Sequence, residues 1–524
     1  MRQGKYVEPN SYCPAYANPG RNTVTQETRH AELAVAAGYQ PGDIEITQPV
    51  APLAPGGAVD YDLLVLGSGS AAFAAAIKAR DAGKTVALAE AGTLGGSCVN
   101  IGCVPSKALL RAGEAAWQAG HHPFAGVATH SPEVDLAALV AAKDDLVTTM
   151  RQTKYADLVG EYGFDGLDGH ARFVDADADT VAVGDREIRP GAILVATGAH
   201  PAVPPIPGLA ESGYLTSTTA LELTRVPRRL AVIGANAIGL ELGQFFLHIG
   251  SEVTFIDVAE RIAPFEEPEA SQAFTDALIN QGATVHTSAQ VRQVTREGHS
   301  RTLELTHGDT TAVVEADEIL VATGRRPNTD GLNLDAAGIA TTERGAVKVD
   351  DRLRTTNPRV WAAGDVTGAP QFVYVSAYHG ALAAENALHG ADRVVDYTGL
   401  PRVTFTSPQL AGAGLTEAEA AAAGHDVKTA VLPLSAVPRA LVNRDTHGVI
   451  KLVADTATDR LLGATIVADA AGEAIQAAVL AIRAGMTTSE LAGTFHPYLT
   501  MAEGLKLAAQ TFDRDVHKLS CCAA

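Results

Sequence analysis

The chain has 524 residues, a formal net charge of −20 at pH 7, 46% apolar residues and abundant Gly. This length allows several domains, each with its own core, and the composition is typical of an α/β protein rather than a disordered or fibrous one. The negative charge argues against a nucleic-acid backbone or an anionic membrane as a partner.

Residues 1–58 are rich in Pro, Gly and Ala, which predicts a tail and linker. The first twenty residues lack the apolar core of a signal peptide, and no stretch has the length of a membrane span, so we expect a cytoplasmic location. Five cysteines in so long a chain are not a secreted disulfide framework. Four of them form two pairs, Cys98 with Cys103 and Cys521 with Cys522, whereas Cys13 has no assigned role.

A first βαβ unit spans residues 61–90, with an apolar run, a glycine-rich turn, an Ala-rich helix and a second apolar run. The signature G-x-G-x-x-A falls on Gly67, Gly69 and Ala72, and Glu90 closes the second strand. Glycines let the backbone approach a pyrophosphate at the helix N-terminus, and the carboxylate accepts from ribose hydroxyls. This unit therefore predicts a dinucleotide site.

The stretch GGSCVNIGCVPSK, residues 95–107, places Cys98 and Cys103 at the start of an expected helix. A helix N-terminus lowers the pKa of a thiol, and the thiolate is the reactive form. Four intervening residues can fold back to bring both sulfurs within disulfide reach. A zinc site is disfavoured because no His or further Cys lies nearby at ligand spacing. We interpret the pair as a redox dithiol.

A second βαβ unit spans residues 228–260, with Gly234 and Gly239 in the turn, Asn236 in place of the middle glycine, and Asp257 closing the second strand. Two such units predict two dinucleotides, which suits an electron carrier between a nicotinamide and a flavin. Two apolar strands that end in Ala-Thr-Gly, at residues 196–198 and 322–324, mark where the chain leaves each nucleotide domain. From about residue 399 no phosphate motif recurs, and we expect an interface domain.

GGSCVNIGCVPSK, the two nucleotide units, both Ala-Thr-Gly turns and the AAGD stretch at residues 362–365 together resemble the flavin disulfide oxidoreductases, from about residue 60 to the end. The resemblance implies an α/β fold with two Rossmann-like dinucleotide-binding domains and a C-terminal α+β dimerisation domain in a homodimer. It implies FAD binding by 59–199 with 329–398, NAD(P) binding by 200–328, and dimerisation by 399–524 with its Cys-Cys tail.

The resemblance also implies the roles of individual residues. Cys98 would be the interchange thiol and Cys103 the thiol against the flavin, while Lys107 would lie near flavin N5 and face Glu241. The cofactors would be FAD and NADH or NADPH. The implied cofactor-binding residues are Gly67, Gly69, Ala72, Glu90, Gly92, Ser97, Lys107, Ala171, Thr197, Gly198, Asp365, Val373, Gly234, Gly239, Glu241, Asp257 and Gly324.

The C-terminal stretch HPYLTMAEG departs from the dithiol-reducing members of this family. Those members pair a His with a Glu as the acid and base for the leaving thiol; here His496 is kept, but Met501 stands where Glu is expected and Glu503 comes two residues late. A His without its orienting carboxylate is a poor acid/base partner. Together with the terminal SCCA, this combination resembles the mercury-reducing members of the family.

This closer resemblance implies that Cys521 and Cys522 of one subunit reach the active site of the other. Hg(II) would then be bound by thiolates, with Tyr155 and Tyr498 flanking the metal, and reduced by two electrons. Hg(II) is a soft ion that prefers thiolate sulfur, so transfer between Cys521, Cys522, Cys98 and Cys103 by ligand exchange is chemically consistent. Residues 1–58 contain no C-x-x-C motif, so we expect no attached metal-delivery domain.

The segment FIDVAERIAPF, residues 255–265 at the end of the second unit, favours NADH over NADPH. Asp257 would accept from a 2′-hydroxyl and repel a 2′-phosphate, Arg261 is the only nearby cation, and Gly239 and Gly243 match the NADH-type helix. Two alternatives for the whole chain stay open: a disulfide reductase similar to dihydrolipoamide dehydrogenase, and a flavoprotein that sequesters Hg(II) through thiols without turnover.

Overall fold

The computed structural model describes residues 59–515 and Lys518. Cys13 and the tail pair Cys521 and Cys522 lie outside these residues. Within the described part of the chain, none of the helices combines the length and the apolar character needed to cross a membrane.

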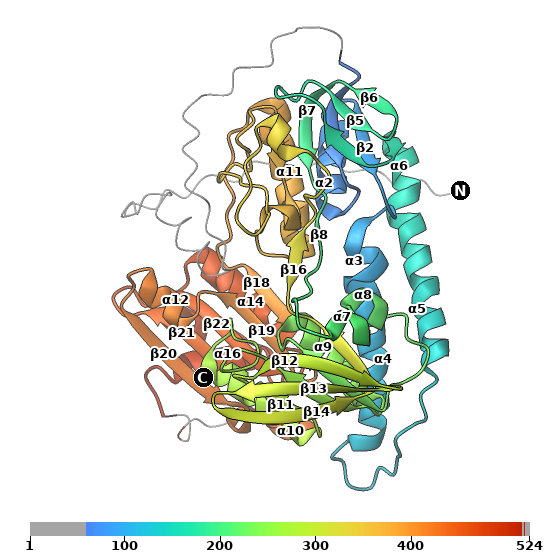
Figure 1. The fold of residues 1–524 in the computed structure, drawn as a ribbon. Helices are drawn as coiled ribbons and strands as arrows, with labels where there is room; N and C mark the ends of the chain where they lie inside the picture. Colours follow the sequence, from blue (N-terminus) through green and yellow to red (C-terminus); the bar gives the residue numbers. More distant parts are fainter. Residues whose placement is uncertain (1–58, 516–517, 519–524) are drawn as a thin grey trace, which may run out of the picture.

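A five-stranded parallel sheet forms the upper part of the molecule (Figure 1). Every residue of its strand β7 is buried, as is usual for a parallel sheet covered on both faces. A small antiparallel sheet contributes Phe173 and Val181 to the same core. In spatial order the strands are β17 (Val360–Ala362), β7 (Pro190–Val195), β1 (Tyr61–Leu66), β2 (Val86–Glu90) and β3 (Asp165–Asp168); the small sheet is β4 (Ala171–Phe173), β5 (Val181–Val183) and β6 (Arg186–Ile188).

Two helices pack closely against each other on the parallel sheet, α2 (Ser70–Asp81) and α11 (Val373–His389). Small residues make this approach possible, because a Cβ at Gly380 would lie 1.9 Å from the carbonyl oxygen of Ala71. Both helices begin beyond the carboxyl ends of the strands, where open α/β sheets bind their ligands.

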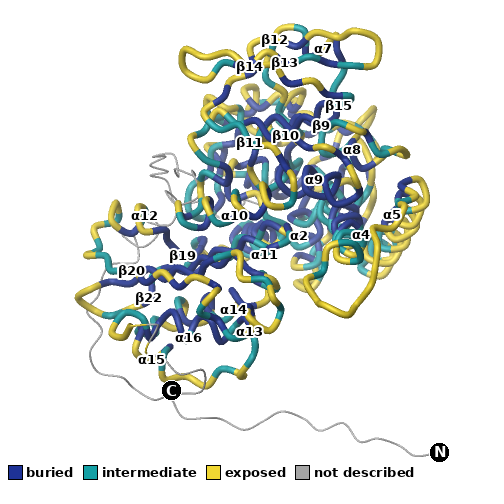
Figure 2. Tube along the Cα trace, turned by 90° about the horizontal axis from the view of Figure 1, so that it is seen from below, coloured by how far each residue is buried: buried dark blue, intermediate teal, exposed yellow. Residues whose placement is uncertain are grey.

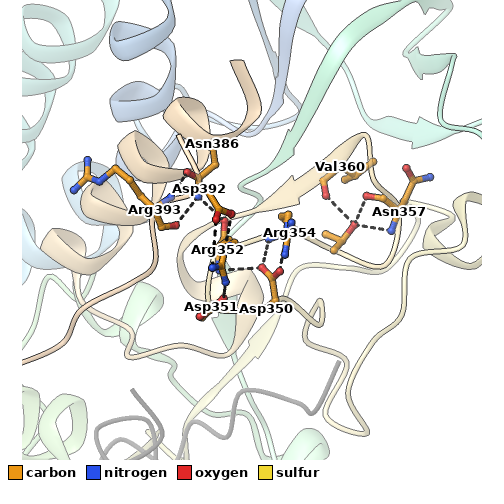
Figure 3. Close-up of polar contacts among 10 residues, drawn as sticks. Asp350, Asp351, Arg352, Arg354, Asn357, Val360, Asn386, Asp392 and Arg393 are labelled. Atoms are coloured by element: carbon orange, nitrogen blue, oxygen red, sulfur yellow. Dashed lines mark hydrogen bonds and ion pairs between the residues drawn. The ribbon is translucent and has the colours of Figure 1, made fainter. Parts of the chain in front are cut away.

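A network of ion pairs and amide hydrogen bonds fastens the loop before β17 to the end of α11 (Figure 3). Arg352 pairs with Asp351 and Asp392, at 2.6 and 2.5 Å. The Asn386 amide donates to the carbonyl oxygens of Arg352 and Arg393 and accepts from the Arg393 N–H. These bonds fix the C-terminal end of α11. They therefore help to keep α11 packed on α2, from which it is separated by about 300 residues of sequence.

The second nucleotide-type unit forms a four-stranded parallel sheet in the lower part of the molecule. Helix α9 (Ala237–His248) is buried from Gly239 onward because it lies between this sheet, helix α4 and the C-terminal domain; Figure 2 shows α9 deep in the interior and the outer turns of α5 exposed. The strands are β11 (Thr284–His286), β10 (Glu252–Ile256), β9 (Arg229–Ile233) and β15 (Glu318–Val321), with helix α10 (Pro268–Asn280) and the antiparallel strands β12 (Gln290–Glu297), β13 (Ser300–His307) and β14 (Thr310–Ala316).

A two-stranded link, β8 (Ala199–Pro201) with β16 (Arg325–Pro327), joins the two halves. A column of helices runs beside it and packs against both halves. The column consists of α3 (Gly96–Ile101), α4 (Cys103–His121), α5 (Leu136–Arg151), the π-helix η1 (Gln152–Ala156) and α6 (Asp157–Tyr162); the short connecting helices are α7 (Leu209–Ser212), α8 (Ser217–Ala220), η2 (Leu334–Ala337) and η3 (Gly364–Thr367).

The C-terminal domain is a five-stranded antiparallel sheet with helices packed against it. The strands in spatial order are β18 (Pro401–Thr404), β19 (Gln409–Gly414), β22 (Leu461–Ala468), β21 (Val449–Asp455) and β20 (Val427–Pro433). The helices are α12 (Glu417–Ala422), η4 (Leu434–Ala436), α13 (Pro438–Asn443), α14 (Ala471–Ala484), α15 (Thr488–Gly493) and α16 (Glu503–Gln510). The expected fold class is confirmed.

Candidate active site

The two central cysteines lie on two separate helices rather than on the single helix start that the sequence predicts. Cys98 is in α3, and Cys103 is the first residue of α4, with Gly102 between the helices at φ −126° and ψ −113°. A Cβ at Gly102 would lie 2.8 Å from the carbonyl oxygen of Ser97, so the reversal requires glycine. The turn directs the two thiols toward each other and leaves Cys103 at a helix N-terminus.

The two thiols interact as a donor and an acceptor. Both cysteines are free and half-buried. The hydrogen bond from Cys98, assisted by the charge of Lys107, lowers the pKa of the Cys103 thiol to about 7, although burial opposes this. Donating to Cys103, together with burial, raises the pKa of Cys98. When the reduced pair loses a proton, the thiolate is therefore on Cys103.

Tyr155 is brought to this pair by the π-helix η1, a feature that is frequent at functional sites. Its ring packs edge-on against Phe73, with centroids 4.8 Å apart, and lies beside the backbone of Gly95. Burial raises the pKa of Tyr155, a hydrogen bond with Ser70 opposes this, and negative charge on the nearby dithiol raises it further. The phenol therefore lies within electrostatic reach of both thiols.

The structure brings Lys107 and Glu241 together across 134 positions of sequence, with Nζ 2.6 Å from a carboxylate oxygen. The other oxygen of Glu241 accepts from the backbone N–H of Phe405 at 2.9 Å. The ring of Phe405 lies under the Lys107 ammonium, 4.9 Å from Nζ to the centroid. The pair is thus fixed between α4, α9 and the C-terminal domain.

The first glycine turn has the features of a pyrophosphate cradle. Helix α2 begins at Gly69 without a side-chain cap and without an acidic residue in its first turn, so its terminal N–H groups are available to an anion. Glu90 accepts from the Ser68 hydroxyl at 2.5 Å and from the Gly92 N–H at 2.7 Å. The Ser68 oxygen in turn accepts from the Gly95 N–H at 3.0 Å, which connects the cradle to the dithiol loop.

Three other residues expected around FAD follow strands of the same parallel sheet. Thr197 and Gly198 follow β7, and the Thr197 hydroxyl donates to the carbonyl oxygen of Asn328 at 2.6 Å. Asp365 lies in η3, where burial raises the pKa of its carboxyl and Arg325 opposes the shift. The Thr197 hydroxyl and the Asp365 carboxyl could hydrogen-bond to the hydroxyl groups of a dinucleotide. The remaining expected residues are Ala72 in α2, Ser97 in α3, Ala171 in β4 and Val373 at the start of α11.

The second glycine turn repeats the carboxylate arrangement with a shorter side chain. Asp257 accepts from the backbone N–H groups of Ala235 and Ala259, at 2.6 and 2.8 Å. A Cβ at Gly239 would lie 1.9 Å from the carbonyl oxygen of Gly234, so α9 packs tightly on its own turn. Helix α9 also begins without a side-chain cap or an acidic first turn. Gly324, at φ +120°, lies three residues after the end of the neighbouring strand β15.

The C-terminal acid/base pair of dithiol reductases is not assembled in this chain. Nδ1 of His496 is hydrogen-bonded to the carbonyl oxygen of Thr494 at 3.1 Å, and Glu503 accepts from the Leu499 N–H at 3.1 Å. Tyr498 lies in the same loop, before α16, which packs in the C-terminal domain away from α3 (Figure 1). Its expected place beside Cys98 would therefore require a second copy of the chain.

The described residues contain no group of three or more His, Cys, Asp and Glu side chains arranged to hold a metal ion. Within this part of the chain, the dithiol offers two sulfur ligands. The expected additional ligands Cys521 and Cys522 lie outside the described residues, so a thiol site with more than two ligands would need them.

Sequence reasoning missed two aromatic residues at the site. Phe405 contacts both Lys107 and Glu241, but it lies in the loop after β18 with no local motif. Tyr374 stacks on Phe372 and donates to the carbonyl oxygen of Pro401 at 2.5 Å. Burial raises its pKa, which the nearby Arg402 opposes and the Cys103 thiolate raises further. Tyr374 lies in the stretch QFVYVSA, residues 371–377, which could have indicated it, whereas no comparable local motif surrounds Phe405.

Two family models match the chain. Residues 61–380 match the pyridine nucleotide-disulphide oxidoreductase family, and residues 400–509 match the dimerisation domain of that family. Among solved structures, the HOCl-induced flavoprotein disulfide reductase RclA from Escherichia coli is similar, with a TM-score of 0.76 and 31% identity over 86% of this chain and 99% of that chain. LpdA from Mycobacterium tuberculosis has a TM-score of 0.77 and 25% identity over the same shares.

Curated relatives are more similar in sequence. A mercuric reductase from Staphylococcus aureus is 52% identical over 93% of this chain and 89% of the relative. A mercuric reductase from Streptomyces lividans is 51% identical over 88% of this chain and 98% of the relative. A third, from Shigella flexneri, is 45% identical over 88% of this chain and 82% of the relative.

Proposed function

The chain belongs to the pyridine nucleotide-disulphide oxidoreductase family, and on this premise we propose that it reduces Hg(II) to elemental mercury with NAD(P)H. The mercuric reductases among its relatives support this substrate. The observation in the chain itself that favours it over a disulfide substrate is the separation of His496 from Glu503, because thiol release from a disulfide needs an oriented acid.

The proposed reaction balances as one Hg(II) ion and one NADH giving elemental mercury, NAD⁺ and a proton. FAD, when bound, would pass the two electrons from the nicotinamide to the metal. Thiolate exchange would bring Hg(II) to Cys98 and Cys103, and both sulfur–mercury bonds break as the metal is reduced. We thus propose that the dithiol binds the metal, that Tyr155 lies beside the bound metal, and that the charge of Lys107 stabilises the thiolate.

We also propose a homodimer in which the partner supplies the tail thiols and Tyr498. Phe495 is 99% exposed, and Tyr498 is half exposed in the same loop. Large apolar side chains gathered in one exposed loop are typical of an interface. The proposed FAD-binding, NAD(P)-binding and dimerisation domains keep the boundaries given above.

Mercury-dependent NADH oxidation, measured together with the loss of volatile mercury, tests the function. Lipoamide and glutathione disulfide serve as parallel substrates. Turnover with Hg(II) alone supports the proposal, turnover with lipoamide favours the dithiol-reductase alternative, and stoichiometric Hg(II) binding without NADH oxidation favours sequestration.

A Cys521→Ala, Cys522→Ala double variant tests the proposed relay. With thiol-chelated Hg(II), we expect turnover to fall by at least about tenfold, since direct transfer from a tight thiol complex is slow. Flavin reduction by NADH, measured in a stopped-flow instrument, should stay at the wild-type rate. Wild-type turnover in this variant would remove the tail from the mechanism.

NADH should be the preferred reductant. One guanidinium nitrogen of Arg261 donates to the carbonyl oxygens of Pro264 and Glu266, while Asp257 presents a negative charge at the end of β10. We expect kcat/KM for NADH to exceed that for NADPH by about tenfold or more, because a like charge beside the 2′-phosphate costs at least about 1.4 kcal/mol. Equal values or a preference for NADPH would contradict this.

A further inference from the structure

One fully buried lysine joins the C-terminal domain to the proposed NAD(P)-binding domain, residues 200–328, which is called the nicotinamide-type domain below. Lys451 lies in the middle of β21, and its side chain is 1% exposed. Its ammonium contacts four carboxylate oxygens: one of Glu267 at 2.9 Å, both of Glu269 at 3.0 and 2.9 Å, and one of Glu417 at 2.7 Å. Burial disfavours the charge, but these three glutamates raise the pKa of Lys451, so the lysine stays protonated.

The three glutamates come from two domains. Glu417 is in α12, in the same domain as Lys451, whereas Glu267 and Glu269 lie at the start of α10 in the nicotinamide-type domain. Arg402 of β18 makes a second link, to Glu266, at 3.0 Å. Breaking a buried ion pair is strongly destabilising, because the remaining charge is left without a partner. Segment 266–269 is therefore held firmly against the C-terminal sheet.

Hydrogen bonds and one peptide link connect this clamp to the second glycine turn, beginning with the Ser271 N–H, which donates to the carbonyl oxygen of Glu267 at 2.9 Å. The Ser271 hydroxyl in α10 donates to the carbonyl oxygen of Ile262 at 2.6 Å. The next residue, Ala263, donates its N–H to the carbonyl oxygen of Ala235 at 2.8 Å. Ala235 in turn donates its own N–H to Asp257. Both backbone groups of Ala235, in the middle of the turn, thus bond to the loop of residues 257–267 that ends at the clamp.

We propose that Lys451 is a positioning residue for the nicotinamide dinucleotide: through Glu267 and Glu269 it holds the 257–267 loop, and this loop holds the turn that receives the pyrophosphate and the adenosine ribose. The inference rests on the proposed use of NAD(P)H by this domain. It concerns binding of the dinucleotide, so it does not depend on which acceptor receives the electrons. Coupling through such networks changes affinity by a few-fold to about thirtyfold.

Two glutamates of the same cluster provide a matched test. Glu269→Ala removes a contact between domains, and Glu417→Ala removes a contact within one domain to the same ammonium; both side chains are in the first turn of a helix and are 40% and 50% exposed. In the FAD-loaded enzyme, the dependence of flavin reduction on NADH concentration gives Kd and the limiting rate separately. Calorimetric titration with NAD⁺ gives a second Kd without turnover.

For Glu269→Ala we expect both Kd values to rise by about three- to tenfold with an unchanged limiting rate, and for Glu417→Ala a change below about twofold. Lys451→Met should raise Kd further. If the Lys451→Met variant does not fold, the comparison of the two glutamate variants still tests the positioning role. Equal Kd changes in the two glutamate variants, or a loss of thermal stability with wild-type Kd in both, would reduce Lys451 to a structural role. Mercury is absent from both measurements, so failure of the proposed metal substrate would be seen separately.

Discussion

Replacing Cys98 or Cys103 by serine is expected to lower Hg(II)-dependent NADH oxidation by at least about three orders of magnitude, because a hydroxyl neither binds a soft ion nor completes a redox dithiol. NADH should still reduce the flavin in both variants, since the nicotinamide turn and the Lys107–Glu241 pair are unchanged. Steady-state assays and anaerobic flavin reduction separate the two outcomes. Residual mercury turnover within tenfold of wild type would exclude the dithiol as the metal site.

The two serine variants should also differ from each other in their spectra. Cys98→Ser keeps Cys103, the thiol whose pKa is lowered to about 7, whereas Cys103→Ser removes it. A thiolate against oxidised flavin gives a long-wavelength charge-transfer absorbance, which we expect only in Cys98→Ser. That absorbance should grow as pH rises and the Cys103 thiol loses its proton, because only the deprotonated sulfur donates charge. Adding Lys107→Met should move its midpoint to higher pH, since the ammonium favours the thiolate. A band in Cys103→Ser would reverse the assignment.

Features that a short segment determines were predictable from the sequence. The first glycine turn, with Glu90 about twenty residues later, requires only a strand, a tight turn and a helix, and the structure has all three. The same holds for Gly234 and Asp257 in the second unit. The spacing of Cys98 and Cys103 indicated a fold-back, but the reversal depends on Gly102, whose backbone angles a pattern does not reveal.

Features that depend on distant packing were not predictable. Phe405 meets Glu241 only because β18 lies against α9, and Lys451 meets Glu267 only because β21 lies against α10. The sequence of a strand does not reveal whether a lysine in it is buried or exposed, because burial depends on which elements pack against that strand. The π-helix that turns Tyr155 inward is likewise a local irregularity without a sequence period. Long-range contacts therefore complete a site whose local parts the sequence already indicates.

Alanine substitutions at Gly67 and Gly69 are expected to lower FAD affinity for different physical reasons. Gly67 has φ +114°, and a Cβ there would lie 2.5 Å from the carbonyl oxygen of Ala196, so Gly67→Ala should destabilise the protein by about 1–3 kcal/mol and disturb the cradle. Gly69 has φ −79°, and the nearest protein atom to its Cβ would be Gly96 Cα at 3.8 Å. At the proposed FAD site, the added methyl at Gly69 would therefore meet the pyrophosphate rather than the protein.

Gly69→Ala should consequently weaken FAD binding by about a hundredfold, roughly 2.7 kcal/mol, while lowering the stability of the apoprotein by no more than about 1 kcal/mol, because alanine accepts this backbone conformation but is a poorer N-cap than glycine. Gly83→Ala is the control for strain alone, because Gly83 has φ +74° with open space around its Cβ; it should lose about 1 kcal/mol of stability and keep wild-type FAD affinity. Reconstitution of apoprotein followed by flavin fluorescence gives the affinities, and thermal unfolding of the apoproteins gives the stabilities. Wild-type FAD affinity in Gly69→Ala would show that the pyrophosphate does not approach Gly69, because a methyl group at this position would then have met nothing.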